Sequence, residues 1–316
     1  MKFDFKLTAT EIKALRAIWQ GNEQSIGRIS EATDMLYPVT SRTISSLAKK
    51  GFLLVSRRGL SRQVSLSDAK HAQLFKRLLS EFSHMNFEKI LIGSSMEVLS
   101  HITDAPLKRK EIEEQSGLTA KTVKVTLKRL REFGVVFVKE GFTYVLNQRF
   151  SLLGEFVEEF RRYHNQRLAE DFSADSVIIW QREKEFLIKT SSSKEKESFF
   201  LTGISAFHLH GIKLFLPDYN YYFHSLYKTK LGVEDILLHA IRADPNSTRT
   251  ILSVLLLWRR NDRMDMKYLL EEANKYGVDD VVNALIDYLN SEGRKKPEYF
   301  PTWAEYLAKA EEYGLR

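Results

Sequence analysis

The same arrangement of residues occurs twice in the first half of this chain, in residues 8–67 and again in residues 94–147. Each copy has the pattern of a short helix-turn-helix followed by a hairpin. Matching residues lie 83 positions apart: Ile29 and Ile112, Leu47 and Leu130, Gly51 and Gly134, Leu53-Leu54-Val55 and Val136-Phe137-Val138. In the first helices the offset is 84, as for Leu15 and Leu99, so one loop residue was gained. Such a repeat predicts the duplication of one supersecondary unit.

Both copies predict the same succession of elements. Thr10 and Ser25 are expected to cap the first two helices of the first copy, and Pro38 suits the first turn of a third helix, where a missing N–H leaves no bond unmade. The expected elements are helices over 10–20, 38–50, 109–115 and 119–133, and strands over 52–56, 62–66, 135–139 and 142–146. Three helices followed by a hairpin are typical of a winged helix.

Charge is divided unevenly along the chain. Residues 1–150 hold 25 Lys and Arg against 15 Asp and Glu, a net of +10, whereas residues 151–316 hold 23 against 26, a net of −3. Met35–Ser67 and Gln115–Arg131, at matching places in the two copies, contain no carboxylate. Solvated helix faces usually carry both signs, because like charges four residues apart repel. Two basic stretches at matching places therefore indicate a polyanionic partner.

Composition narrows the class of protein further. With 316 residues, 43% of them apolar and 28% charged, the chain has room for two or three ordinary domains. It has no cysteine, which excludes disulfides, thiolate zinc sites and a cysteine nucleophile. The first residues contain no apolar signal core, and the longest apolar run, Ile251–Trp258, is too short to cross a bilayer. We therefore expect a cytoplasmic protein without membrane contact.

Short motifs in both copies point to a known class of DNA-binding domain. Over Ile26–Ile29 and Val39–Leu53, the first copy resembles the winged-helix core of MarR-type transcription regulators. Over Lys110–Ile112, Ser116–Leu118 and Val123–Gly134, the second copy is similar to winged helices of archaeal regulators. The resemblance implies that the third helix of each copy enters the major groove of double-stranded DNA and that the hairpin lies along the phosphate backbone.

This resemblance also assigns residues to the DNA interface. Those expected on the open faces of the two third helices, near base edges or phosphates, are Thr40, Ser41, Arg42, Ser45 and Lys49, and Thr119, Lys121, Thr122, Lys124, Lys128 and Arg131. The hairpin residues expected at phosphates are Arg57, Arg58, Arg62 and Lys139. The alternative is an ordinary solvated surface, because winged helices also serve in protein contacts.

Two amphipathic segments flank the second copy. Residues 68–87 predict a helix with an apolar stripe formed by Leu74, Phe75, Leu78, Leu79 and Phe82. We expect this stripe to pack on the neighbouring copies. The alternative is the seam of a homodimer, which many two-fold DNA readers need. Residues 151–171 predict a second helix, which marks the boundary to a third domain.

The last part of the chain has a different pattern. It predicts strands over 176–180, 185–190, 212–216 and 221–223, a short helix within 199–211, and helices over 233–242, 247–260, 265–276 and 279–290. Thr302 and Glu305 predict a capping box for the last helix. The predicted fold class is α+β: two winged helix-turn-helix domains followed by a mixed α/β domain that ends in a helical bundle. The expected domains are residues 1–92, 93–150 and 151–316.

The third domain carries a second resemblance. Over Phe200–Gly211, Val233–Leu238 and Asp265–Val278 it resembles the C-terminal domain of abortive-infection antitoxins that accompany nucleotidyltransferase toxins. In that family a winged helix binds the promoter of its own operon, and the following domain supports regulation or counteracts the toxin. This chain departs from the family in having two winged helices.

The residues do not predict an enzyme. Gly93-Ser94 follows an apolar run as in a nucleotidyltransferase site, but that chemistry needs an Asp-x-Asp pair for magnesium, and only Asp104 follows. His208 and His210 lack an acidic or cysteine partner at zinc-ligand spacing. The aromatic residues within 219–223 are expected to pack in a strand rather than stack on a ligand. We expect no catalytic residues, no metal and no cofactor.

Two functions follow from these patterns. The first is a sequence-specific transcription regulator that binds double-stranded DNA through helices 38–50 and 119–133 and through the basic hairpins. The second is an antitoxin-like interaction protein whose third domain binds a partner protein such as a nucleotidyltransferase. The two are compatible, because an antitoxin can repress its own promoter.

Overall fold

Residues 5–19, 23–58, 61–215, 218–261 and 263–315 are described by the computed structural model of the chain, without the side chains of Arg58 and Asp104. They divide into two compact units, unit 1 (Met1–Gln166) and unit 2 (Arg167–Arg316). The division lies inside helix α9 (Ser151–Phe172), later than the expected boundary at 151, because the first turns of α9 pack into the core of unit 1. Gln20 and Leu216, the expected ends of a helix and a strand, lie outside the described residues.

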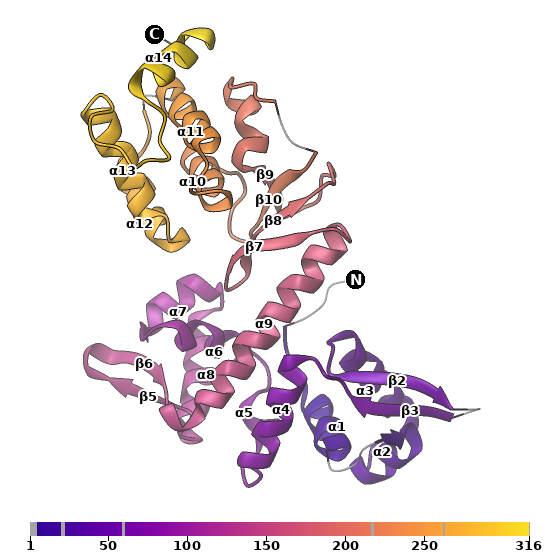
Figure 1. The fold of residues 1–316 in the computed structure, drawn as a ribbon. Helices are drawn as coiled ribbons and strands as arrows, with labels where there is room; N and C mark the ends of the chain where they lie inside the picture. Colours follow the sequence, from indigo (N-terminus) through magenta and orange to yellow (C-terminus); the bar gives the residue numbers. More distant parts are fainter. Residues whose placement is uncertain (1–4, 20–22, 59–60, 216–217, 262, 316) are drawn as a thin grey trace. The chain divides into compact units, whose positions relative to one another are not determined.

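Unit 1 contains both copies, and their elements follow in the same order. The first copy consists of α1 (Ala9–Trp19), β1 (Glu23–Ser25), α2 (Ile26–Thr33), α3 (Tyr37–Lys49), β2 (Leu53–Arg58) and β3 (Ser61–Leu66). The second consists of α6 (Ser95–Asp104), β4 (Leu107–Lys108), α7 (Arg109–Ser116), α8 (Ala120–Glu132), β5 (Val136–Lys139), the turn η1 (Glu140–Phe142) and β6 (Thr143–Leu146). Both antiparallel sheets have the same strand order, β1-β3-β2 and β4-β6-β5. Figure 1 shows the hairpins β2–β3 and β5–β6 at opposite sides of unit 1.

Local sequence determines where the helices of the copies begin and end. Thr8 caps α1 in place of the expected Thr10: its hydroxyl accepts a hydrogen bond from the Glu11 N–H (3.2 Å), and Glu11 Oε2 accepts one from the Thr8 N–H (2.8 Å). After α3 and α8, Gly51 (φ 74°) and Gly134 (φ 68°) turn the chain into the hairpins in a conformation that favours glycine.

Helices α4 (Lys70–Glu81), α5 (Phe87–Ile90) and α9 join the two copies around one hydrophobic core. The apolar stripe on α4 packs inside this core, as expected, and its members Leu74, Phe75, Leu78 and Leu79 are at most 5% exposed. This stripe is therefore not a dimer seam. The single helix expected over 68–87 is wrong, because α4 ends at Glu81 and the chain turns before α5.

Helix α9 contacts both copies. The ring of Phe160 lies 5.1 Å from that of Phe52 in the first copy, measured between centroids. Arg161 donates a hydrogen bond to Ser100 Oγ in the second copy (2.6 Å), and its guanidinium carbon lies 3.7 Å from the ring centroid of Phe5. Because burial of one such aromatic side chain stabilises a fold by about 1.5–3 kcal/mol, α9 holds the two copies in one body.

Unit 2 is built on a four-stranded antiparallel sheet with the strand order β7-β8-β10-β9. Its elements are β7 (Val177–Arg182), β8 (Glu185–Thr190), β9 (Phe199–Thr202), η3 (Gly203–His210), β10 (Asn220–His224), α10 (Val233–Ala243), α11 (Thr248–Arg260), α12 (Met266–Tyr276), α13 (Asp279–Asn290) and α14 (Trp303–Glu312). The strand expected over 212–216 is wrong for 212–215. Ile212 instead follows the Gly211 cap of η3, where its N–H donates to the Phe207 carbonyl oxygen (3.1 Å) and its side chain is buried.

The two faces of this sheet are both covered. Trp180, Leu187 and Phe223 pack into the core that the helices from α10 onward share. On the other face, Phe199 stacks on Phe172 from the end of α9 at a centroid separation of 4.4 Å. The fold is thus a mixture of helices and small antiparallel sheets, as the α+β prediction required. Within the described ranges, each helix is too short or too polar to span a membrane.

Candidate nucleic-acid interface

Helices α3 and α8 turn matching positions inward. Their buried residues are Thr40, Thr43, Ile44 and Leu47 in α3 and Val123, Thr126, Leu127 and Leu130 in α8, each pair 83 residues apart. Since the buried faces match residue by residue, the outward faces of the two helices also present matching positions. The outward positions can therefore be compared one by one.

Thr40 is fully buried, so the expectation that it lies on the open face of α3 is wrong. Its hydroxyl donates to the carbonyl oxygen of Leu36 in the preceding turn (3.2 Å), which satisfies the hydroxyl inside the core. Val39, expected inside, is only half-buried. Ile44 and Leu47 are buried as the apolar pattern predicted, so the error is confined to the first turns of the helix, where Thr40 takes the inward position in place of Val39.

The predicted residues of α3 that reach solvent are Ser41, Arg42, Ser45 and Lys49, with Ser41 partly covered. Arg42 Nε donates to the Pro38 carbonyl oxygen (3.2 Å), and Ser45 Oγ donates to the Ser41 carbonyl oxygen (2.9 Å). These bonds hold the two side chains along the helix surface. Tyr37, which the sequence pattern did not single out, is 55% exposed in the first turn of the same helix.

The hairpin of the first copy places two arginines directly opposite each other. Arg57 in β2 pairs with Arg62 in β3 in the antiparallel register, and both are exposed. Directly opposed residues project from the same face of a sheet, and like charges in that arrangement destabilise the pair. Arg58 pairs with Ser61, but its side chain lies outside the described part of the chain. The hairpin thus carries a like-charge pair that its own stability does not favour.

Helix α8 carries its cations on the outward face. Lys121, Lys124, Lys128 and Arg131 are all exposed, and Lys128 Nζ lies 3.8 Å from Glu132 Oε1. Thr119 caps the helix, because its hydroxyl accepts a hydrogen bond from the Thr122 N–H (3.3 Å). Lys139 is exposed at the end of β5. The predicted residues of the second copy therefore all reach solvent at least in part.

Two basic residues of the sequence stretches point inward instead. Arg129 donates to the Ile92 carbonyl oxygen (2.9 Å) and to Ser95 Oγ (2.8 Å), and burial lowers the pKa of its guanidinium. Lys50 is buried and contacts Glu11 at 2.7 Å. These two cations brace the first and third helices of their copies, so they do not contribute to an outward surface.

A groove of about 740 Å³ runs between α8 and β5. Its wall includes Lys128 and Arg131 from the helix and Phe137 and Asn147 from the sheet side. Phe137 and Asn147 were not predicted from sequence, because a groove formed between two elements leaves no periodic pattern in either one.

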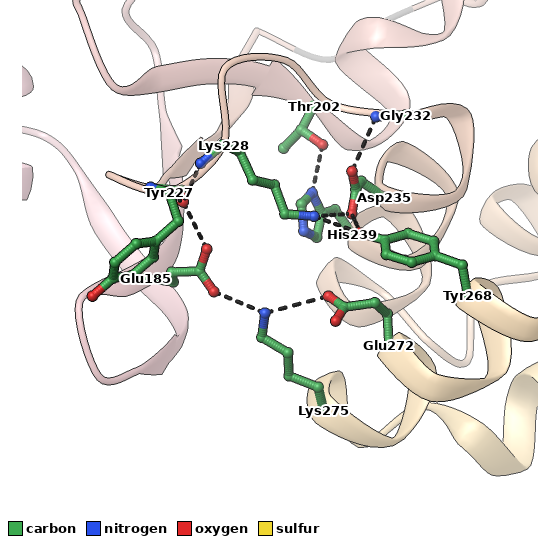
Figure 2. A network of polar contacts seen from close by, with 11 residues as sticks. Glu185, Thr202, Tyr227, Lys228, Gly232, Asp235, His239, Tyr268, Glu272 and Lys275 are labelled. Carbon is green, nitrogen blue, oxygen red and sulfur yellow. Dashed lines mark hydrogen bonds and ion pairs between the residues drawn. The ribbon is translucent and has the colours of Figure 1, made fainter. Parts of the chain in front are cut away.

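Unit 2 contains a separate group of charged side chains between its sheet and the helices α10 and α12 (Figure 2). Asp235 accepts hydrogen bonds from Lys228 Nζ (2.5 Å), the Tyr268 hydroxyl (2.7 Å) and the Gly232 N–H (3.0 Å). Burial opposes ionisation of Asp235, but the bonds and charge of Lys228, with the other two donors, lower its pKa below the usual value. The group therefore holds the loop before α10 against α12.

The same region contains a fully buried histidine. His239 Nδ1 lies 2.7 Å from Thr202 Oγ1, its ring stacks on Phe223 at 4.3 Å, and burial lowers its pKa to about 3. Nearby, Lys275 bridges Glu185 (2.8 Å) and Glu272 (3.3 Å). A neutral imidazole and balanced ion pairs are expected in a packed polar core.

The histidines considered from sequence, His208 and His210, lie in the last turn of η3. His208 is exposed and its Nδ1 lies 2.9 Å from the Ser205 carbonyl oxygen, whereas burial lowers the pKa of His210. No group of three or more His, Cys, Asp or Glu side chains with metal-binding geometry occurs among the described residues.

Comparison with known proteins bears on unit 2. Residues 196–315 match the family model described as HVO_2833_C, C-terminal. The match covers less than half of the chain, and its description names no ligand, partner or reaction. No curated protein matches the chain.

Proposed function

We propose that this protein is a sequence-specific regulator of transcription that binds double-stranded DNA with two winged helices. In this proposal each copy in unit 1 is one winged helix. Helices α3 and α8 approach the major groove, and the basic hairpins approach the phosphate backbone. The order of three helices and a hairpin, present twice, supports the proposal.

The observation that carries the proposal is the exposed pair Arg57 and Arg62. Opposed like charges on a hairpin cost about 0.2–1 kcal/mol of stability relative to a neutral pair. A polyanion reverses this cost, because each arginine can then contact a phosphate oxygen. The net charge of +10 in residues 1–150, which contain both copies, also attracts a polyanion.

The test replaces both arginines by alanine and measures two properties of the full chain. Arg57→Ala/Arg62→Ala should unfold at equal or slightly higher urea concentration than wild type, because the repulsion is gone. The same variant should bind a 30-base-pair duplex more weakly, and the slope of log K against log salt should become shallower by about 1.8, or 0.9 for each phosphate that is no longer neutralised. Fluorescence anisotropy at several salt concentrations measures the affinity and its salt slope.

Lys76→Ala/Arg77→Ala is the matched control, because it removes two exposed positive charges from α4 in the same unit. It should leave the salt slope unchanged. Duplex binding that is absent in wild type, or equally weakened by both double variants, would contradict the proposal.

A second candidate function concerns unit 2. Its surface exposes large apolar side chains, with Phe215 at 95%, Leu209 at 64% and Leu226 at 59% exposure. Such side chains favour a protein partner where they adjoin one another. In keeping with the antitoxin resemblance, we propose a nucleotidyltransferase encoded beside this chain as that partner. The test is co-purification of the two full-length proteins. Binding should be lost in Leu209→Ser/Phe215→Ser and retained in Arg57→Ala/Arg62→Ala. If the wild type does not co-purify with the product of the neighbouring gene, the proposal is contradicted.

A further inference from the structure

The two copies present unlike chemistry at matching outward positions. On α8, cations occupy four outward positions: Lys121, Lys124, Lys128 and Arg131. The residues 83 positions earlier, on α3, are Pro38, Ser41, Ser45 and Ala48, and none of them is charged. Because the buried faces of the two helices match residue by residue, this difference is a real exchange of groups on equivalent surfaces.

The opposite difference also occurs, because two cations of α3 match residues of α8 that are not cationic. Arg42 of α3 matches Val125 of α8, which is 55% exposed, and Lys49 matches Glu132. In the hairpins it is the first copy that carries more positive charge, the reverse of the third helices. Arg57 faces Arg62 in the first copy, whereas Lys139 faces Thr143 in the second. The first copy thus concentrates positive charge on its hairpin, and the second concentrates it on its third helix.

These two arrangements suit different parts of a duplex. Lysine ammonium groups are compact, strongly hydrated point charges, which attract phosphates but lack the planar fork with which arginine recognises a base edge. A helix that presents three lysines and an arginine in successive turns is therefore attracted to the phosphate backbone along its length. The groove beside α8 is lined by Lys128 and Arg131 together with Glu132, and the residues that line it from the β5 side are uncharged.

The face of α3 suits base edges instead. Ser41 and Ser45 are short hydroxyl side chains that allow a helix to approach the groove floor closely, and serine hydroxyls bond to any base. Arg42 is held along this face by the bond from its Nε to the Pro38 carbonyl oxygen (3.2 Å). That bond uses Nε and not the two terminal nitrogens, which are the groups that make a bidentate contact to O6 and N7 of guanine.

We propose that the two copies divide the work of binding: α3 determines sequence preference, with Arg42 as the specificity-determining residue, and α8 anchors the protein to phosphates without sequence preference. This inference rests on the proposed function. It assigns to α8, at the major groove, contacts with the phosphates that border the groove and none with base edges.

The experiment uses charge-conserving substitutions in the full-length chain. A randomised duplex library is selected with wild type, and affinity is then measured for the selected and a scrambled duplex across salt concentrations. Arg42→Lys keeps the charge, so its salt slope should equal that of wild type, but its preference for the selected duplex should fall about five- to 150-fold, the range for one bidentate arginine–guanine contact. Lys124→Arg is the matched control and should change neither quantity.

Removal of charge from α8 gives the complementary result. Lys121→Ala/Lys124→Ala should weaken binding to both duplexes equally and make the salt slope shallower by about 1.8. A wild type that binds no duplex, or binds all duplexes alike, refutes the proposed function itself. Preference retained in Arg42→Lys, or abolished in Lys121→Ala/Lys124→Ala, overturns the division between the copies and leaves the proposed function intact. Circular dichroism confirms that each variant is folded.

Discussion

Replacement of Gly51 by alanine tests how tightly α9 packs on the first copy. A Cβ atom at Gly51 would lie 2.3 Å from Cζ and 2.5 Å from the hydroxyl oxygen of Tyr163 on α9. Gly134 occupies the matching position in the second copy with nearly the same φ, 68° against 74°, yet a Cβ there would meet no described atom within 4 Å. The two glycines therefore separate backbone strain from steric overlap within one chain.

The expected magnitudes follow from these two effects. An L-residue in the left-handed region costs about 1–2 kcal/mol, and the stiffer unfolded chain offsets about 0.4–1 kcal/mol of it. We expect Gly134→Ala to lower the free energy of unfolding by about 1 kcal/mol. Gly51→Ala also displaces the Tyr163 ring, which packs on His71 at 4.5 Å, and overpacking of this kind adds about 1–3 kcal/mol.

Urea unfolding followed by far-UV circular dichroism measures both changes in the free energy of unfolding. A double-mutant cycle with Tyr163→Ala then identifies the cause, because Gly51→Ala should cost only about 1 kcal/mol once the ring is absent. Equal destabilisation by Gly51→Ala and Gly134→Ala in the wild-type background, or an effect at Gly51 that persists without the Tyr163 ring, would refute the reasoning.

Two further predictions concern buried titratable groups. Burial lowers the pKa of His71 to about 4, and its Nε2 lies 2.9 Å from the Lys50 carbonyl oxygen. Below pH 6.5 the unfolded chain therefore binds a proton at His71 that the folded chain does not bind, so the free energy of unfolding should fall as the pH falls from 6.5 to 4. His71→Gln should reduce the slope of the free energy of unfolding against pH by one proton, about 1.4 kcal/mol per pH unit. An unchanged slope, measured by urea unfolding at several pH values, contradicts this prediction. In unit 2, Lys228→Met should lower the free energy of unfolding by about 3–5 kcal/mol, because it leaves Asp235 buried without its cation. Asp235→Asn in the same background should recover part of that loss. A Lys228→Met chain as stable as wild type would show that the ion pair contributes nothing to stability.

Much of the fold could be predicted from local signals. Gly51 and Gly134, Ser25, Thr119 and the Thr302–Glu305 capping box mark helix ends through bonds within a few residues, and the structure has the helices where these signals stand. The strand expected over 212–216 failed for a different reason. Ile212 is apolar because it is buried after Gly211, and an apolar run alone does not distinguish a strand from a buried turn.

Every charged interface residue predicted from sequence whose side chain the structure describes is exposed, and the one error, Thr40, concerns a residue type that can face either way. Arginine and lysine rarely lie inside a core unless paired, so the exposure of Arg42 and Lys124 was predictable, whereas Lys50 and Arg129 turn inward to partners that the sequence pattern did not indicate. Threonine can face either way, because its hydroxyl can bond to its own helix, and Thr40 is buried on that account. The groove beside α8 and the opposed pair Arg57 and Arg62 could not be predicted, because both depend on how the strands are paired. The sequence does not specify that register unless the conformation of the turn between the strands is known.

Because unit 1 contains two copies of one arrangement, residues at matching positions can be compared to see which differences the packing of the core permits. Ser46 donates to Glu11 Oε1 (2.7 Å) in the first copy, and Arg129 donates to Ser95 Oγ (2.8 Å) at the matching positions of the second. The contact between first and third helix is thus kept while its chemistry is exchanged, because a buried polar group must find a partner in either copy. No such packing constraint applies to Ser41 and Lys124 on the outward faces. Packing therefore does not account for their difference, and substitutions at these positions, and not in the core, test the proposed division between the two copies.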